Sequence, residues 1–560
     1  MENNEEQQQI SVAEMLVKAL EHEGVEYAFG IPGEENLDFM KALHESKKIK
    51  TIIVRHEQGA AFMADVYGRL TGKAAVCFST LGPGATNLIT GVADANGDGA
   101  PLVAITAQVS TDKMPLTAHQ YLDLETLFQP ITKRTKMVMS PSSVNEIVRL
   151  AFKYAESERP GATHICVPQD VAGMPVPAGA AQKLIKIPAL GKEYADADEL
   201  ASAIAEINRA QHPLLLVGHS AVRSHAAKAL TEFATQLRIP VINTMMAKGI
   251  IPYTNPYHLC TIGIPQKDYA NVMLDQADLV ICVGYDIVEL APLKWNSKDN
   301  HRILHIDSRM AHINKLYQPD VEVVGDISHS LERIMLACDP KAEPTDFFAL
   351  RQQFRDENAV YTHDESFPIK PQRLLYDVRK IMGPDDIVVS DVGAHKMWIA
   401  RHYECHKPNT CLISNGFATM GISLPGSIAA KMLYPERRVL SITGDGGFMM
   451  NNQELETAVR LNVPIVVLVL TDQSYGLIKW KMDDRFHDHF HVDFTNPDFV
   501  KLAEAMNAVG FRVNATEELI PTLEKAFNCG KPAVVECPVD YTENEKLTQH
   551  LAEVIQRFQN

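Results

Sequence analysis

One short stretch of the chain combines a carboxylate with glycines at the point where a strand is expected to end. The apolar run VLSIT leads directly into Gly444-Asp445-Gly446-Gly447, and the next apolar run, PIVVLVLT, ends at Asp472. Consecutive parallel strands joined by a right-handed crossover lie close together, and ligands gather beyond their carboxyl ends. We therefore expect both carboxylates to face one crevice, with QELETAVRL between them forming a single crossover helix.

This pair of carboxylates suits a hard divalent cation. Mg²⁺ takes oxygen ligands, usually one or two carboxylates together with phosphate oxygens. Gly446 and Gly447 have no side chain, so a diphosphate could approach the backbone amides at the start of the following helix. The pattern predicts Asp445 and Asp472 as metal ligands. Taken alone, GDG is explained equally well by a tight turn with a helix N-cap.

A second isolated carboxyl group occupies a similar position near the start of the chain. The stretch VRHEQGAAF places Glu57 directly after an apolar strand and before a helix. Such a group could exchange a proton with a bound ligand. It could also serve only to interact with the positive end of the helix dipole, as many glutamates do at this position.

The elements that would position these residues fall into three blocks. Apolar runs of strand length, such as KAAVCFST, ADLVICVG and RVLSITG, alternate with helical patterns, and this alternation indicates mostly parallel sheets. The Pro-, Gly- and Ala-containing stretch VPAGAAQKLIKIPALG and the charged stretch CDPKAEPTD separate the blocks. We predict an α/β protein with three doubly wound parallel-sheet domains, at residues 1–185, 190–345 and 365–548.

Composition excludes several classes of function. The chain has 560 residues, 46% hydrophobic and 22% charged, with a net charge of -17. This charge disfavours binding to nucleic acid or to an anionic membrane surface. No apolar run is long enough to span a bilayer, and MENNEEQQQ is unlike a signal peptide, so we expect a cytoplasmic protein. Nine cysteines without a CxxC pair indicate reduced, buried thiols rather than a disulfide framework or a zinc site.

Together these motifs resemble the thiamine diphosphate-dependent enzymes. The family motif begins with GDG and ends in Asn or Asp after about the interval seen here, 27 positions (472 − 445). The resemblance implies Mg²⁺ held by Asp445, Asp472 and the backbone carbonyl of Ser474. Many members end the motif in Asn-Asn where this chain has Thr471-Asp472, and Asp is an equally good oxygen ligand. Glu57 matches the family's glutamate, which protonates the cofactor's aminopyrimidine so that the cofactor can act as its own base.

Over nearly its whole length the chain resembles the acetolactate synthases in particular. The segments FSTLGPGATNLITGVADA, ERPGATHICVPQDV, SDVGAHKMW and GFATMGISLPGSIAA match that group. The resemblance implies that Met420 supports the thiazolium and that the carbonyl of Ala418 receives the exocyclic amine. Met420 would otherwise be read as a core residue and His395 as a structural one. The implied cofactor-binding residues also include Glu57, Pro32, Gly82, Ala394, His395, Gly446, Gly447, Asp472, Gly476 and Leu477.

Several residues distinguish two branches of the group. His119-Gln120 and GYDIVELAPLKWN resemble the catabolic branch, and the middle block has no GxGxxG, so we expect no FAD. His119 and Gln120 would hydrogen-bond the reacting oxygens. Trp480 instead matches the tryptophan that shapes acceptor choice in the biosynthetic branch, although simple packing also explains it.

The resemblance implies a complete reaction and an assembly. One pyruvate is decarboxylated and joined to a second, giving acetolactate and carbon dioxide. Because Glu57 and Asp445 lie in different blocks, the resemblance implies at least a homodimer with the active site between subunits, and often a homotetramer. The alternatives are an FAD-containing biosynthetic synthase, a pyruvate oxidase, an acyl-CoA lyase and a non-catalytic cofactor-binding subunit.

Overall fold

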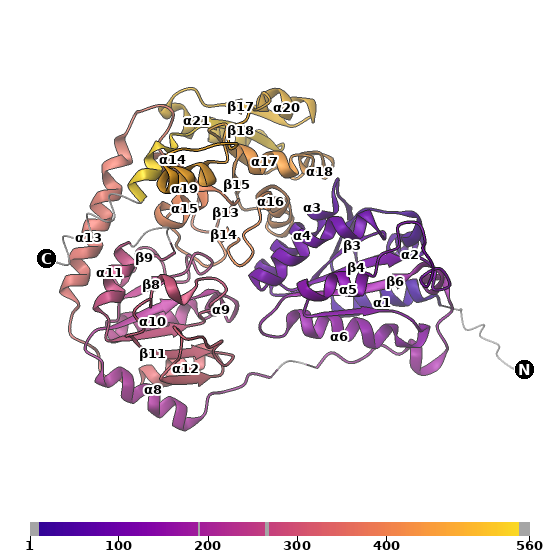
Figure 1. Cartoon of the computed structure of the whole chain (residues 1–560), viewed down its shortest axis with the longest axis horizontal. Helices are drawn as coiled ribbons and strands as arrows, with labels where there is room; N and C mark the ends of the chain where they lie inside the picture. Colours follow the sequence, from indigo (N-terminus) through magenta and orange to yellow (C-terminus); the bar gives the residue numbers. More distant parts are fainter. Residues whose placement is uncertain (1–9, 189–190, 264–267, 548–560) are drawn as a thin grey trace, which may run out of the picture. The chain divides into compact units, whose positions relative to one another are not determined.

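The computed structural model describes residues 10–188, 191–263 and 268–547, and Figure 1 labels their elements. The chain divides into two compact units. The first unit contains Met1–Leu190, Ile428–Leu433 and Asn451–Leu461, and the second contains Gly191–Ser427, Tyr434–Met450 and Asn462–Asn560.

The first unit is built on a six-stranded parallel sheet of order β2-β1-β3-β4-β6-β5. Its central strands are buried along their whole length, as expected for a sheet covered by helices on both faces. Helices α1 and α6 pack together on one face, and α3 and α4 pack together on the other (Figure 1). The strands are β1 (Tyr27–Gly30), β2 (Lys50–Ile53), β3 (Ala75–Ser79), β4 (Leu102–Gln108), β5 (Arg134–Met137) and β6 (Ala162–Pro168). The helices are α1 (Val12–Glu23), α2 (Leu37–Glu45), α3 (Glu57–Thr71), α4 (Pro83–Asp98), α5 (Leu124–Phe128), α6 (Val144–Glu156) and α7 (Gln169–Gly173).

The second unit contains two further parallel sheets. The first of them has the order β12-β11-β10-β7-β8-β9 and a core of Leu, Ile and Val side chains. Its strands are β7 (Pro213–Val217), β8 (Val241–Asn243), β9 (His258–Thr261), β10 (Leu279–Val283), β11 (Arg302–Asp307) and β12 (Val321–Val324). The accompanying helices are α8 (Ala197–Arg209), α9 (His219–Arg223), α10 (Ala227–Leu237), α11 (Tyr269–Gln276), α12 (Ile327–Met335) and α13 (Thr345–Ala359).

The other sheet of this unit has the order β14-β13-β15-β16-β18-β17, again with parallel pairs. Its strands are β13 (Ile387–Ser390), β14 (Cys411–Ile413), β15 (Val439–Gly444), β16 (Val466–Thr471), β17 (Val509–Arg512) and β18 (Ala533–Pro538). From residue 371 on, the helices along the chain are α14 (Pro371–Ile381), α15 (Ala394–His402), α16 (Ser423–Leu433), α17 (Asp445–Asn451), α18 (Glu454–Arg460), α19 (Gly476–Phe486), α20 (Phe499–Ala505) and α21 (Leu519–Asn528). Of these, α18 and residues 428–433 of α16 belong to the first unit.

The predicted fold class, with three doubly wound parallel sheets, is confirmed. The helix predicted at QELETAVRL is present as α18, but the crossover between β15 and β16 is not a single helix, because the short helix α17 precedes α18. The boundaries 1–185, 190–345 and 365–548 stay a prediction. All nine cysteines are free thiols, and seven of them are buried. In the described part of the chain, no helix combines the length and the apolar character needed to cross a bilayer.

Candidate active site

The structure brings Asp445 and Asp472 together at the carboxyl ends of two neighbouring strands. Asp445 is the first residue of α17 and Asp472 follows β16, and Gly444 pairs with Leu470 across the two strands. The Asp445 Oδ2 atom accepts the backbone N–H groups of Asp472 at 3.2 Å and of Gln473 at 2.8 Å. The two carboxylates therefore share one edge of the sheet.

Neighbouring polar groups orient both carboxylates. The Asn496 side-chain amide donates to Asp445 Oδ2 at 2.7 Å, and the Ser474 hydroxyl donates to Asp472 Oδ2 at 2.8 Å. Burial, and then the charge of Asp445, raise the pKa of Asp472 to about 6. A divalent cation between the carboxylates would relieve this repulsion. The sequence carried no signal for Asn496.

The donor set at this edge fits Mg²⁺ better than a softer metal. Within the described residues, no three or more His, Cys, Asp or Glu side chains are grouped so as to hold a metal ion. A cation bound to Asp445 and Asp472 would therefore take its remaining ligands from backbone, water or phosphate oxygens. That is the coordination Mg²⁺ prefers, whereas zinc sites use His and Cys.

Next to the carboxylates lies a cavity of about 200 Å³. The first residues of three helices line it: residues 393–395 at the start of α15, 445–447 at the start of α17 and 476–478 at the start of α19. Free backbone N–H groups at the start of a helix attract anions. The cavity thus presents amide donors to a phosphate group directly beside the acidic pair.

Three of the glycines that line this cavity are tightly packed against neighbouring side chains. A Cβ atom on Gly447 would lie 2.9 Å from Asp391 Oδ1, and one on Gly446 would lie 3.0 Å from Tyr475 Cε1. A Cβ on Gly476 would lie 2.6 Å from Asp472 Oδ2. These positions therefore need glycine for steric reasons, because a Cβ atom would collide with the side chains that pack against them.

His395 lines the cavity with a buried imidazole ring. Its Nε2 atom is buried and has no hydrogen-bond partner among the described residues. Burial lowers the pKa of His395 to about 4, so the ring is neutral near pH 7. A buried polar atom without a partner costs free energy.

Ala418 and Met420 line the same cavity from the loop after β14. Ala418 has a φ of 62°, a left-handed conformation that is uncommon for residues with a side chain and is often found at functional sites. The buried Asp391 carboxylate holds the end of this loop, accepting the N–H of Gly421 and the hydroxyl of Ser423, both at 2.8 Å. The sequence did not single out Asp391.

In the first unit, Glu57 is the first residue of α3 and its side chain is buried. The Asn87 side-chain amide, on α4, donates to Glu57 Oε2 at 2.9 Å. A Cβ on Gly84 would lie 3.2 Å from Glu57 Oε1, so the glycine leaves room for the carboxyl group. The sequence had not indicated that Asn87 holds this group.

The other predicted residues of this unit lie in surface loops. His119, Gln120 and Pro32 are exposed, and Gln120 has a φ of 57°. Gly82, also with a positive φ of 52°, lies against this loop, because a Cβ there would be 2.8 Å from the Cβ of Gln120.

Trp480 lies in the apolar core next to the third sheet, with 7% of its surface exposed. On α19, Gly476 and Leu477 line the 200 Å³ cavity, whereas Trp480 lines a neighbouring pocket of about 770 Å³. Packing alone is sufficient to explain the burial of Trp480.

Side chains of the chain itself bond the first turn of the middle sheet. Gly218 leads into α9, and the buried Glu289 carboxylate accepts the N–H of His219 at 3.1 Å and of Met246 at 2.9 Å. The Ser220 hydroxyl donates to Asp307 at 2.7 Å. Glu289 therefore occupies the His219 N–H, one of the donors at a helix start that a dinucleotide pyrophosphate would use in a doubly wound sheet.

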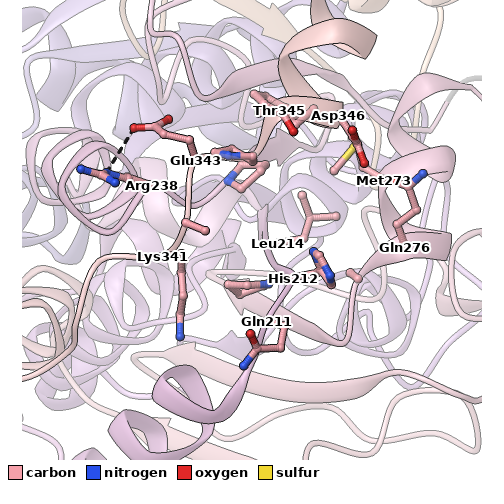
Figure 2. Close-up of a pocket in the computed structure, with 16 residues that line it drawn as sticks. Gln211, His212, Leu214, Arg238, Met273, Gln276, Lys341, Glu343, Thr345 and Asp346 are labelled. Carbon is pink, nitrogen blue, oxygen red and sulfur yellow. Dashed lines mark ion pairs between the residues drawn. The ribbon is translucent and has the colours of Figure 1, made fainter.

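A separate pocket of about 440 Å³ lies at the amino-terminal ends of strands β7 and β8 of the middle sheet (Figure 2). Its lining includes Gln211 just before β7, Arg238 just after α10 and Gln276 at the end of α11. Arg238 is paired with Glu343 at 3.2 Å, as Figure 2 shows. The carboxyl ends of helices carry partial negative charge, which disfavours a diphosphate in this pocket.

Comparison with known proteins assigns a family to this arrangement. Three models of thiamine pyrophosphate (thiamine diphosphate) enzymes match: the N-terminal TPP binding domain at residues 10–127, the central domain at 200–334 and the C-terminal TPP binding domain at 391–537. Relatives include an acetolactate synthase of Bacillus subtilis, 36% identical over 96% of this chain and 94% of the relative. The catabolic acetolactate synthase of Raoultella terrigena is 36% identical over 97% of this chain and 98% of the relative. A probable acetolactate synthase large subunit of Methanococcus aeolicus is 34% identical over 94% and 92%. The chain therefore belongs to the thiamine pyrophosphate enzymes, in the family of the acetolactate synthases.

Proposed function

We propose that this enzyme is a catabolic acetolactate synthase that decarboxylates one pyruvate and joins the remaining two-carbon unit to a second pyruvate. The observation that carries the proposal is the acidic pair Asp445 and Asp472 beside a cavity lined by helix starts. Its presence in a chain 36% identical to two acetolactate synthases over nearly its full length supports the choice of reaction.

Residues of the second unit would hold the cofactor and its metal. Asp445, Asp472 and the Ser474 carbonyl would bind Mg²⁺, and the cavity wall would bind the diphosphate through Gly446, Gly447, Ala394, His395, Gly476 and Leu477. Ala418 and Met420 would contact the ring end of the molecule. When bound, thiamine diphosphate supplies an acidic carbon and an electron sink.

Residues of the first unit would act on protons and on substrate. Glu57 would exchange a proton with the aminopyrimidine nitrogen, and Asn87 would keep its Oε2 atom in place. His119 and Gln120 would donate hydrogen bonds to pyruvate oxygens where charge develops. Pro32 and Gly82 would line the cofactor's pyrimidine end.

The assembly and the acceptor are part of the proposal. We assign a homodimer in which Glu57 of one subunit serves the diphosphate site of the other, with dimers pairing into a homotetramer. Pyruvate is assigned as both donor and acceptor, and Trp480 as a residue that influences acceptor choice. FAD is not expected, because the sequence of the middle domain has no GxGxxG and Glu289 takes the His219 N–H at the first turn of its sheet.

Product analysis tests the proposal directly. Purified protein supplied with Mg²⁺, thiamine diphosphate and pyruvate should release carbon dioxide and form acetolactate in a 1:1 ratio, with no absorption in the visible flavin bands. Glu57→Gln should lower turnover by about 10²-fold or more while thiamine diphosphate still binds, because only proton exchange is removed. Bound flavin and consumption of oxygen would instead indicate an oxidase, and failure to decarboxylate pyruvate would refute the assignment.

A further inference from the structure

A buried carboxylate outside the sites above contacts the turn that leads into Glu57. Glu454, the first residue of α18, is completely buried and belongs to the same compact unit as α3. Its Oε1 atom accepts the backbone N–H of Arg55 at 3.1 Å and of His56 at 3.0 Å. Its Oε2 atom accepts the hydroxyl of Thr457 at 2.7 Å.

The two amides held by Glu454 belong to the residues immediately before Glu57. This turn connects the end of β2 at Ile53 to the start of α3. The packing around the contact is tight, because a Cβ on Gly59 would lie 2.6 Å from Glu454 Oε1. Glycine at position 59 therefore leaves the space that this carboxylate occupies.

Burying the Glu454 carboxyl group costs desolvation free energy. Burial raises the pKa of Glu454 to about 7, even though the Thr457 hydroxyl and the two backbone N–H groups favour the ionised form. A neutral apolar residue would avoid this desolvation cost but would leave two backbone donors without an acceptor. The bonds to residues 55 and 56 are thus the contacts that a carboxyl group gains here.

We propose that Glu454 is a positioning residue for Glu57, fixing the backbone of the turn so that the Glu57 carboxyl group points in its catalytic direction. The assignment rests on the proposed proton exchange by Glu57. Small errors in the placement of a catalytic group can lower a rate by about 10²-fold, so two bonds to the adjacent backbone are sufficient to influence turnover.

Two substitutions of Glu454 separate positioning from simple burial. Glu454→Leu removes the acceptor and should speed hydrogen–deuterium exchange of the Arg55 and His56 amides and lower kcat by about tenfold or more. The KM for pyruvate and the Kd for thiamine diphosphate should change by less than about twofold, because those contacts lie elsewhere. Glu454→Gln keeps an acceptor oxygen and should restore both amide protection and kcat to within about threefold of wild type.

A matched control and a second variant complete the experiment. Glu456→Gln removes the neighbouring carboxylate of α18, which pairs with the Arg55 and Arg460 side chains at the surface, and should leave amide exchange and kcat unchanged. If Glu454→Leu does not fold, Gly59→Ala serves instead, because its methyl group would displace Glu454 Oε1 while Ala favours the helix.

One further readout does not depend on pyruvate turnover. Exchange into D₂O of the acidic carbon-bound proton of bound thiamine diphosphate should slow in Glu454→Leu and recover in Glu454→Gln. If amide exchange rises while cofactor proton exchange and kcat stay at wild-type values, Glu454 is only structural and the inference is overturned. If wild-type protein exchanges the cofactor proton but forms no acetolactate, the proposed function fails while this inference stands.

Discussion

Replacing Asp472 with Asn separates the electrostatic cost of this carboxylate from its proposed use as a metal ligand. Burial and the charge of Asp445 raise the pKa of Asp472 from 3.8 to about 6. A shift of about two pKa units corresponds to roughly 3 kcal/mol of differential stability between the protonation states. In the absence of a cation, ionised Asp472 should therefore destabilise the folded protein by up to about 3 kcal/mol at pH 8.

The sign of the pH dependence follows from the direction of the shift. Because the folded-state pKa of Asp472 is raised, its stabilising contribution is complete below the unfolded pKa of 3.8 and is lost as the pH rises through about 6. Asn carries no charge at any pH. Its side-chain oxygen can still accept the hydroxyl of Ser474, which donates to Asp472 at 2.8 Å, and its amide can donate toward Asp445.

Calorimetric melting in EDTA and in Mg²⁺ with thiamine diphosphate measures both effects. In EDTA at pH 8, Asp472→Asn should melt a few degrees above wild type, and the difference should shrink at pH 5. With Mg²⁺ and cofactor, wild type should gain more than the variant, because its extra charge attracts the cation. Asp484→Asn is the control, because Asp484 is exposed on α19, the helix that follows Asp472 along the chain, and it should change neither profile. A variant that is no more stable than wild type in EDTA at pH 8 would refute the reasoning.

Two further substitutions test other parts of the second unit. Gly476→Ala places a methyl group 2.6 Å from Asp472 Oδ2 and should displace this carboxylate. Titration calorimetry should then show Mg²⁺ affinity reduced by about tenfold or more. Unchanged affinity would mean that Asp472 is not a ligand. Glu289→Gln removes a carboxyl group whose pKa is raised by burial from 4.5 to about 7. Ionisation of this group should make wild type less stable as the pH rises from 5 to 8, so the Tm of the variant should fall less over this range. A variant whose Tm falls with pH as steeply as that of wild type would contradict this.

The sequence was sufficient to predict that Asp445 and Asp472 meet. Two apolar runs of strand length that are joined by a crossover form parallel strands, and the carboxyl ends of parallel strands lie at the same edge of the sheet. The same local regularity made the three sheets predictable, and glycines at 446 and 447 indicated an open cavity. What these residues bind was implied by resemblance, and the metal and cofactor roles remain proposals.

The groups that hold the site in place were not predictable from local pattern. Asn496 lies 51 positions from Asp445, and Glu454 lies 399 positions from Arg55, so only the folded chain brings these partners together. The short helix α17 before the predicted helix α18 was likewise not anticipated.

The sequence by itself determined the strongly apolar strands and the two carboxylates that follow β15 and β16, because apolar runs bounded by turn residues act over a few neighbouring positions. The tertiary structure alone decided which distant donor satisfies each buried carboxylate: Asn87 for Glu57, Asn496 for Asp445 and the 55–56 turn for Glu454. The physical reason is that burying a charged oxygen requires a hydrogen-bond donor in three-dimensional contact, and chain separation places no limit on where that donor comes from.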